Sequence, residues 1–349
     1  MQEKTKLRAY RMRNFTFFGL IVLCFFSILI SCRKQNSATP KEVVLYCSVD
    51  QEFAEPIIAQ FEKQSGIKVL ARYDTEANKT VGLVQKLRSE ASKPVADVFW
   101  SNEVFYMTRL AEEGLFAPYE SSETKDWPEM YRDPLKRWYG FGLRARVIAY
   151  NTNKVKAEDA PKRLEDCLDN KWKDRIAMAS PESGTTGGDV ASWFAHYGSE
   201  KAIEILKALK ANEINIVAGN SIAIKMVYTG QADICFTDTD DVYAAQRNGY
   251  PAAMNFLRQG DQGPLVIPNT AALIKNAPHP DEAKVLLDFI FSEDLEKLLV
   301  ESDSHNCPIR PALAQKYSEY LIPDHLNIDY SKIAEQLTTS IEKAKEILD

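Results

Sequence analysis

The chain has 349 residues, with 43 Lys and Arg against 49 Asp and Glu, so its formal net charge is −6. Its content of 45% hydrophobic and 26% charged residues is typical of a globular protein and excludes a disordered or collagen-like chain. The acidic balance argues against a nucleic-acid partner, because proteins that bind nucleic acids present basic surfaces.

The first 31 residues have the pattern of an export signal. Basic residues between positions 4 and 13 precede an apolar run at 17–30, which is shorter than the roughly 20 residues that a membrane-spanning helix needs. The run ends in Leu-Ile-Ser before Cys32, which resembles a bacterial lipobox, so we expect Cys32 to be the lipidated first residue of the mature protein. An uncleaved anchor or a signal without a lipid is the alternative. Residues 32–42 are polar and are expected to form a tether.

Strand and helix patterns alternate after this tether. Short connections between buried apolar runs and helical repeats predict an α/β unit with a mostly parallel sheet and helices on its faces. The expected strands are 43–47, 67–73 and 96–100, and the expected helices are about 53–65, 79–92 and 102–113.

Two long extended segments, at 140–150 and 264–274, frame a second α/β series. The series has expected strands at 176–180, 215–218 and 233–237 and expected helices at 188–197, 200–211, 221–229 and 242–248. Further helices are expected at 281–291, 293–300 and 331–348.

The two extended segments predict a discontinuous domain, because the chain leaves the first unit near residue 143 and returns near residue 271. Such a pair of crossings makes a hinge between two lobes. The first lobe is expected to comprise 43–143 and 271–320, and the second lobe 144–270. The C-terminal helix, within 325–349, is expected to pack on the lobes.

Several stretches are similar, in the same order, to a known family. Residues 46–54, 93–100, 142–147, 219–221 and 233–241 resemble the substrate-binding proteins of ABC importers, in the branch that includes ferric-iron binders. The resemblance covers about residues 43–345. It implies a type II periplasmic-binding-protein fold, in which two lobes with mixed, mostly parallel sheets are joined by a two-strand hinge and close on a small ligand.

The same resemblance implies the partners and the location of the protein. It implies an ABC permease as partner and a position in the periplasm or at the cell surface, with a lipid anchor in the membrane. It implies no cofactor and no enzymatic activity. The residues agree, since the four His lie in no recognisable nucleophile or metal-ligand motif.

In such folds the ligand lies beyond strand ends, against helix starts. A glycine- and hydroxyl-rich loop before the 188–197 helix suits an anion, because its backbone N–H groups point at the ligand. Simple capping and turn formation is the alternative for this loop and for Asn220. The candidate ligand-binding residues are Asp50, Asn102, Glu103, Arg144, Ser183, Gly184, Thr185, Asn220 and Asp238.

The chain departs from the family in the loop 238–241, which is called the acidic loop below. In the best-known ferric binders two adjacent tyrosines are ligands, and Asp240 and Asp241 fall at those positions, while Asp50 falls where some members have a histidine. Clustered carboxylates favour a hard cation, which makes Asp50, Asp240 and Asp241 candidate metal ligands for Fe3+. Capping of the following helix is the competing explanation.

Arg144 and Arg146 alternate along the first extended segment and therefore lie on one side of it. One of them is expected to hold an anion or to pair with the acidic loop, and an interlobe salt bridge is equally consistent. The sequence thus predicts the solute-binding component of an ABC importer, with ferric iron, alone or with a bridging anion, as its cargo. A small oxyanion or organophosphonate held by the 183–185 loop, Asn220 and Arg144 is the alternative, and a surface lipoprotein without a transport role is the third possibility.

Overall fold

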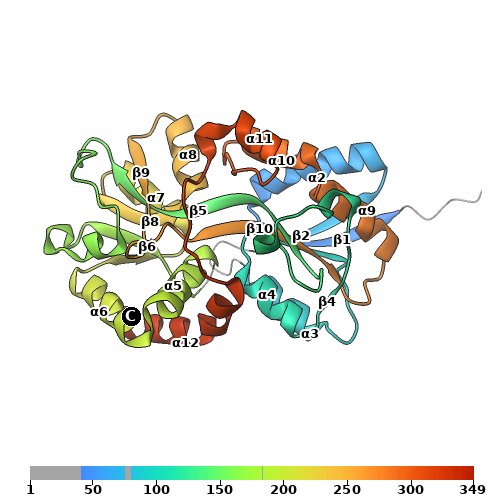
Figure 1. Cartoon of the computed structure of the whole chain (residues 1–349), viewed down its shortest axis with the longest axis horizontal. Coiled ribbons are helices and arrows are strands. Elements are labelled where there is room, and N and C mark those ends of the chain that lie inside the picture. The colour runs from blue at the N-terminus through green and yellow to red at the C-terminus, as the bar shows by residue number, and fades with distance from the viewer. Residues whose placement is uncertain (1–40, 75–79, 183) are drawn as a thin grey trace, which may run out of the picture. The chain divides into compact units, whose positions relative to one another are not determined.

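The computed structural model describes residues 41–349 except 75–79 and 183, and Figure 1 shows their arrangement. The first sheet is built from three parallel strands, in the order β2-β1-β3, and it continues through the antiparallel strand β10, which also pairs with the short β4. The bounds are β1 (Glu42–Cys47), β2 (Lys68–Tyr73), β3 (Val98–Ser101), β4 (Phe116–Ala117) and β10 (Val266–Ile274).

One long strand, β5 (Tyr139–Asn151), passes from the first sheet to the second (Figure 1). Its residues up to Ala145 pair with β10, and from Arg146 onward it pairs with β8 and β9. All thirteen residues are buried, including the two arginines, Arg144 and Arg146, which therefore need buried partners. β5 and β10 are therefore the two extended segments by which the chain crosses between sheets.

The second sheet lies around the other half of β5. Strand β6 is parallel to both β7 and β8, while β8 and β9 are antiparallel to β5. The bounds are β6 (Ile176–Ala179), β7 (Asn215–Val217), β8 (Ile234–Asp238) and β9 (Ala252–Phe256).

Helices cover both faces of each sheet. Successive side chains of β1 point to opposite faces, and each set packs under different helices. Val43 and Leu45 pack in the core under α2, α9 and α10, whereas Val44 and Tyr46 pack in the core under α3 and α4. Around the second sheet, α5 and α6 pack on one face and α7 and α8 on the other. The bounds are α2 (Gln51–Ser65), α3 (Val81–Ser89), α4 (Phe105–Glu112), α5 (Gly184–Tyr197), α6 (Ser199–Ala211), α7 (Asn220–Tyr228), α8 (Thr239–Arg247), α9 (Pro280–Ile290) and α10 (Glu293–Glu301).

The last helices follow β10. Helix α11 (Pro311–Lys316) is short, and α12 (Tyr330–Leu348) packs against α4 as well as α5 and α6. Helix α12 therefore contacts elements of both lobes. In the part of the chain that the structure describes, no helix is long and apolar enough to cross a membrane. The expected residue bounds of the two lobes and of the C-terminal segment stay predictions.

Candidate functional site

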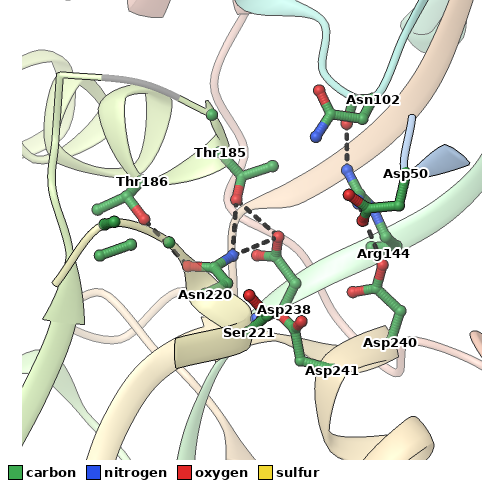
Figure 2. A pocket seen from close by; sticks show the side chains of 14 residues that line it. Asp50, Asn102, Arg144, Thr185, Thr186, Asn220, Ser221, Asp238, Asp240 and Asp241 are labelled. Carbon is green, nitrogen blue, oxygen red and sulfur yellow. Dashed lines mark hydrogen bonds and ion pairs between the residues drawn. The ribbon is translucent and has the colours of Figure 1, made fainter. Parts of the chain in front are cut away.

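A polar pocket opens where strand ends and helix starts from both lobes meet (Figure 2). The space inside it is about 40 Å³, which is room for a bare ion or a few water molecules. The first lobe contributes the ends of β1 and β3, and the second lobe contributes the starts of α5, α7 and α8. The lining residues are Asp50, Asn102, Arg144, Ala179, Gly184, Thr185, Thr186, Ala218, Gly219, Asn220, Ser221, Asp238, Asp240 and Asp241.

Three of the lining carboxylates gather at the start of α8. Asp238, Asp240 and Asp241 each offer one carboxylate oxygen, and these oxygens lie within 4.8 Å of one another. The Asp241 carboxylate accepts hydrogen bonds from the Thr237 hydroxyl at 2.6 Å and from the Asp238 backbone N–H at 3.3 Å. Capping thus accounts for part of the acidic loop. It does not account for Asp240, whose carboxylate points toward Arg144 instead (Figure 2).

Arg144 joins the two sides of the pocket. Its side chain, in a residue only 7% exposed, donates to the Asp240 carboxylate at 3.1 Å and to the backbone carbonyl of Asn102. Arg144 therefore pairs with the acidic loop, while its contact with the first lobe is a hydrogen bond to a carbonyl and not an interlobe salt bridge. Burial opposes its charge, but Asp240 and Asp238 outweigh that effect and raise the pKa of Arg144.

Arg146 lies behind the pocket and is fully buried. Its guanidinium contacts Asp189 on α5 at 2.9 Å and Asp238 at 2.7 Å. Burial alone would raise the pKa of Asp238, but the guanidinium groups of Arg146 and Arg144 hold it below its ordinary value. Asp238 is therefore an ionised carboxylate.

The starts of α5 and α7 form the opposite wall. The Thr185 hydroxyl donates to Asp238 at 2.6 Å, and the Asn220 amide nitrogen donates to both Asp238 and the Thr185 oxygen at 3.1 Å. The Thr186 hydroxyl donates to the Asn220 amide oxygen at 3.3 Å. Backbone N–H groups in the first turns of these helices lack helical partners, so this wall favours an anion.

On the first-lobe side, Asn102 is fixed by hydroxyl groups. Its amide oxygen accepts from Thr80 at 2.9 Å and from Ser48 at 3.1 Å. The amide nitrogen is therefore the donor that Asn102 retains for a ligand. Asn102 suits an anion or a bound water better than direct contact with a metal ion.

Most of the predicted site residues meet in this pocket. Glu103 does not line it: its carboxylate accepts from the backbone N–H groups of Phe105 and Tyr106 at the start of α4, and burial raises its pKa to about 7. Ser183 and Cys32 lie outside the described residues. The predicted residues that line the pocket are Asp50, Asn102, Arg144, Gly184, Thr185, Asn220, Asp238, Asp240 and Asp241.

Sequence reasoning missed Asp189, the second partner of Arg146. The signal was present, because Asp189 is an acidic residue inside the otherwise apolar and small-residue helix α5. A buried acid on such a helix requires a cationic partner. Thr186 and Ser221 also line the pocket, and each adjoins a candidate residue.

Comparisons with known proteins agree with the expected fold. The iron-bound structure of HitA from Pseudomonas aeruginosa superposes with a TM-score of 0.77 at 26% identity, covering 88% of this chain and 99% of that one. Iron uptake protein A1 of Synechocystis is 29% identical over 294 residues, which is 79% of this chain and 80% of that protein. A putative 2-aminoethylphosphonate-binding periplasmic protein of Salmonella typhimurium is 26% identical, over 74% of this chain and 75% of that protein.

The type II periplasmic-binding-protein fold is thereby confirmed, with two lobes and a two-strand hinge. The model of the bacterial extracellular solute-binding proteins matches residues 93–331. That family consists of non-enzymatic transport components that work outside the cytoplasm, which confirms the prediction that this chain is not an enzyme. The chain belongs to the bacterial extracellular solute-binding protein family.

Proposed function

We propose that the chain is the solute-binding component of an ABC importer and that it carries ferric iron, with a bridging anion, in the pocket between its lobes. The relatives named for iron uptake or iron binding support this cargo. The partner would be a membrane permease. Lipidation of Cys32 would hold the protein at the membrane, so that loaded molecules stay near that permease.

The charge of the pocket is the observation that carries the proposal. Four carboxylates, from Asp50, Asp238, Asp240 and Asp241, line it, against one guanidinium, from Arg144, among the lining residues that the structure describes. The buried pair of Arg146 and Asp189 behind them adds no net charge. The pocket thus has an excess of three negative charges and is partly shielded from water. A trivalent cation balances this charge best, because it offsets the repulsion between the carboxylates.

The geometry provides separate places for the metal and the anion. Asp50 lines the pocket from the first lobe, and Asp240 and Asp241 line it from the start of α8 (Figure 2). Carboxylate oxygens are the ligands that hard cations prefer. The starts of α5 and α7 lie beside them and suit an oxyanion. A metal ion bound by the aspartates would therefore have its remaining positions open toward the anion wall.

The test is the double variant Asp240→Asn with Asp241→Asn. Both substitutions keep side-chain size but remove the charges that would coordinate the metal, so we expect affinity for iron, supplied as ferric nitrilotriacetate, to fall more than about 100-fold. Isothermal titration measures this loss. The matched control, Glu335→Gln with Glu342→Gln, removes two charges from the exposed side of α12 away from this pocket and should leave iron binding nearly unchanged. Unchanged iron affinity in the aspartate variant would refute carboxylate coordination.

An aminophosphonate is the second candidate, and one observation favours it. The pocket pairs an anion-binding wall with a carboxylate cluster, and a zwitterion with a phosphonate and an ammonium group matches both. The Salmonella relative fits this alternative by its printed name. Tight binding of 2-aminoethylphosphonate to the unaltered protein, with no binding of iron, would favour this candidate over the metal.

A further inference from the structure

We propose that the buried pair Asp238–Arg146 makes this pocket reject an oxyanion that arrives without a metal. This inference concerns the specificity of the proposed iron site and rests on that function only for its biological meaning. Asp238 is then a positioning residue, and it does not coordinate the cargo.

The charge around Arg146 disfavours a free oxyanion at the anion wall. The buried Arg146 guanidinium lies beside the anion wall, 3.4 Å from the Thr185 hydroxyl oxygen, and it contacts Asp238 at 2.7 Å and Asp189 at 2.9 Å. Two carboxylates around one guanidinium leave this group of three side chains with a net negative charge. An oxyanion at the starts of α5 and α7 would therefore meet repulsion in a region of low dielectric.

Asp238 also occupies the hydrogen-bond donors of the anion wall. A carboxylate only accepts hydrogen bonds, so Asp238 fixes the direction of the network around it. It accepts hydrogen bonds from the Thr185 hydroxyl at 2.6 Å and from the Asn220 amide nitrogen at 3.1 Å. The Asn220 amide oxygen in turn accepts a hydrogen bond from the Thr186 hydroxyl. Three side chains that could donate to an oxyanion thus donate within the wall instead.

Both effects have one source, because Asp238 lies at the junction of three helix starts. It precedes α8, contacts Thr185 in the first turn of α5 and contacts Asn220, the first residue of α7 (Figure 2). Asp238 is 2% exposed, and its two oxygens already accept from Arg146, Thr185 and Asn220. Its position suits a residue that organises the wall better than one that coordinates a metal.

The experiment is titration of inorganic phosphate, without metal, into the unaltered protein and Asp238→Asn. An amide at this position leaves Arg146 with one counter-charge and accepts fewer hydrogen bonds, so Thr185 and Asn220 can turn donors toward the pocket. Affinity for phosphate should rise roughly tenfold or more. Equal or weaker phosphate binding in Asp238→Asn would overturn the proposal.

A double-variant cycle separates this pairing from simple removal of negative charge. In an Arg146→Gln background the gain from Asp238→Asn should shrink to the part that comes from the released Thr185 and Asn220 donors, because no guanidinium remains to be unmasked, while any gain from Asp241→Asn should persist. If Arg146→Gln does not fold, the Arg146→Lys background retains the charge and should retain the gain. A gain that is equally large without the arginine charge would also overturn the proposal.

Iron titrations keep this result distinct from the proposed function. If the unaltered protein binds no ferric nitrilotriacetate but Asp238→Asn gains phosphate affinity, the iron assignment fails and the specificity pair stands. If iron binds and the phosphate gain is absent, the pair fails and the iron assignment stands.

Discussion

Glu103 illustrates how the surroundings of one residue decide its chemistry. Its neighbour Asn102 reaches the pocket, but the Glu103 carboxylate turns back to the first N–H groups of α4 and is fully buried. Burial raises its pKa to about 7, against an ordinary value of 4.5, while the hydrogen bonds and Arg144 oppose that rise. A buried carboxyl of this kind links the stability of the protein to pH.

We therefore predict that Glu103→Gln removes a destabilising pH dependence. Between about pH 4.5 and 7 the folded protein holds a proton on Glu103 that the unfolded chain has released. The free energy of unfolding of the unaltered protein therefore falls as the pH rises through this window. Above about pH 7 this group causes no further loss. At pH 8 the free energy of unfolding of Glu103→Gln should exceed that of the unaltered protein by up to roughly 3 kcal/mol. Urea unfolding at pH 5 and 8 measures the difference. Removal of a carboxylate from the exposed side of α4, by Glu112→Gln, is the control, and equal pH profiles for the unaltered protein and Glu103→Gln would show the prediction to be wrong.

Helices of the two lobes approach each other closely where α4 meets α5. Gly188 on α5 faces the ring of Phe105 on α4, and a Cβ atom added at Gly188 would lie 1.9 Å from the ring carbon Cε2. Phe105 is itself packed edge-on against Tyr330 of α12, which leaves the ring little room to move. The absence of a side chain at Gly188 is therefore a requirement of this packing.

Gly188→Ala should lower the free energy of unfolding by about 1–3 kcal/mol, because the added methyl group overpacks this contact. Chemical denaturation measures the loss. Adding Phe105→Leu shortens the opposing side chain, so the double variant should be more stable than Gly188→Ala alone. A double variant that is less stable than Gly188→Ala would locate the strain elsewhere.

The sequence patterns predicted most elements within a few residues, and the exceptions have physical causes. Helix α5 starts at Gly184, four residues before the expected start, because Gly184, Thr185 and Thr186 lack an apolar repeat and yet belong to the helix. Strand β9 was missed because Ala252–Phe256 lacks the run of β-branched residues that usually indicates a strand. Its place is determined by pairing with β5, which is a tertiary contact.

The candidate site was predictable as a set of loops but not as a set of contacts. Nine predicted residues line the pocket, since strand ends and helix starts are readable from sequence. The pairing of Arg146 with Asp189 could not be predicted from the sequence. Arg146 lies on a strand and Asp189 on a helix, and the two meet only when the second lobe folds. The direction of the Glu103 side chain also depends on local packing that no spacing reveals.

At the scale of the whole described chain, function depends on two lobes that share one pocket. Arg144 contacts both sides of it, and α12 packs against helices of both lobes. Binding of a cation between Asp50 and the α8 aspartates would draw the lobes together, because each lobe supplies part of the ligand set. The proposed importer role therefore requires that the metal lie between the lobes.

Diffraction from crystals of the iron-loaded protein, recorded at the iron absorption edge, tests this central claim most directly. The account predicts one anomalous peak within coordination distance of the carboxylates of Asp50, Asp240 and Asp241, with density for an anion toward the starts of α5 and α7. A peak bound only to other residues, or fully loaded crystals without a peak between the lobes, would contradict it.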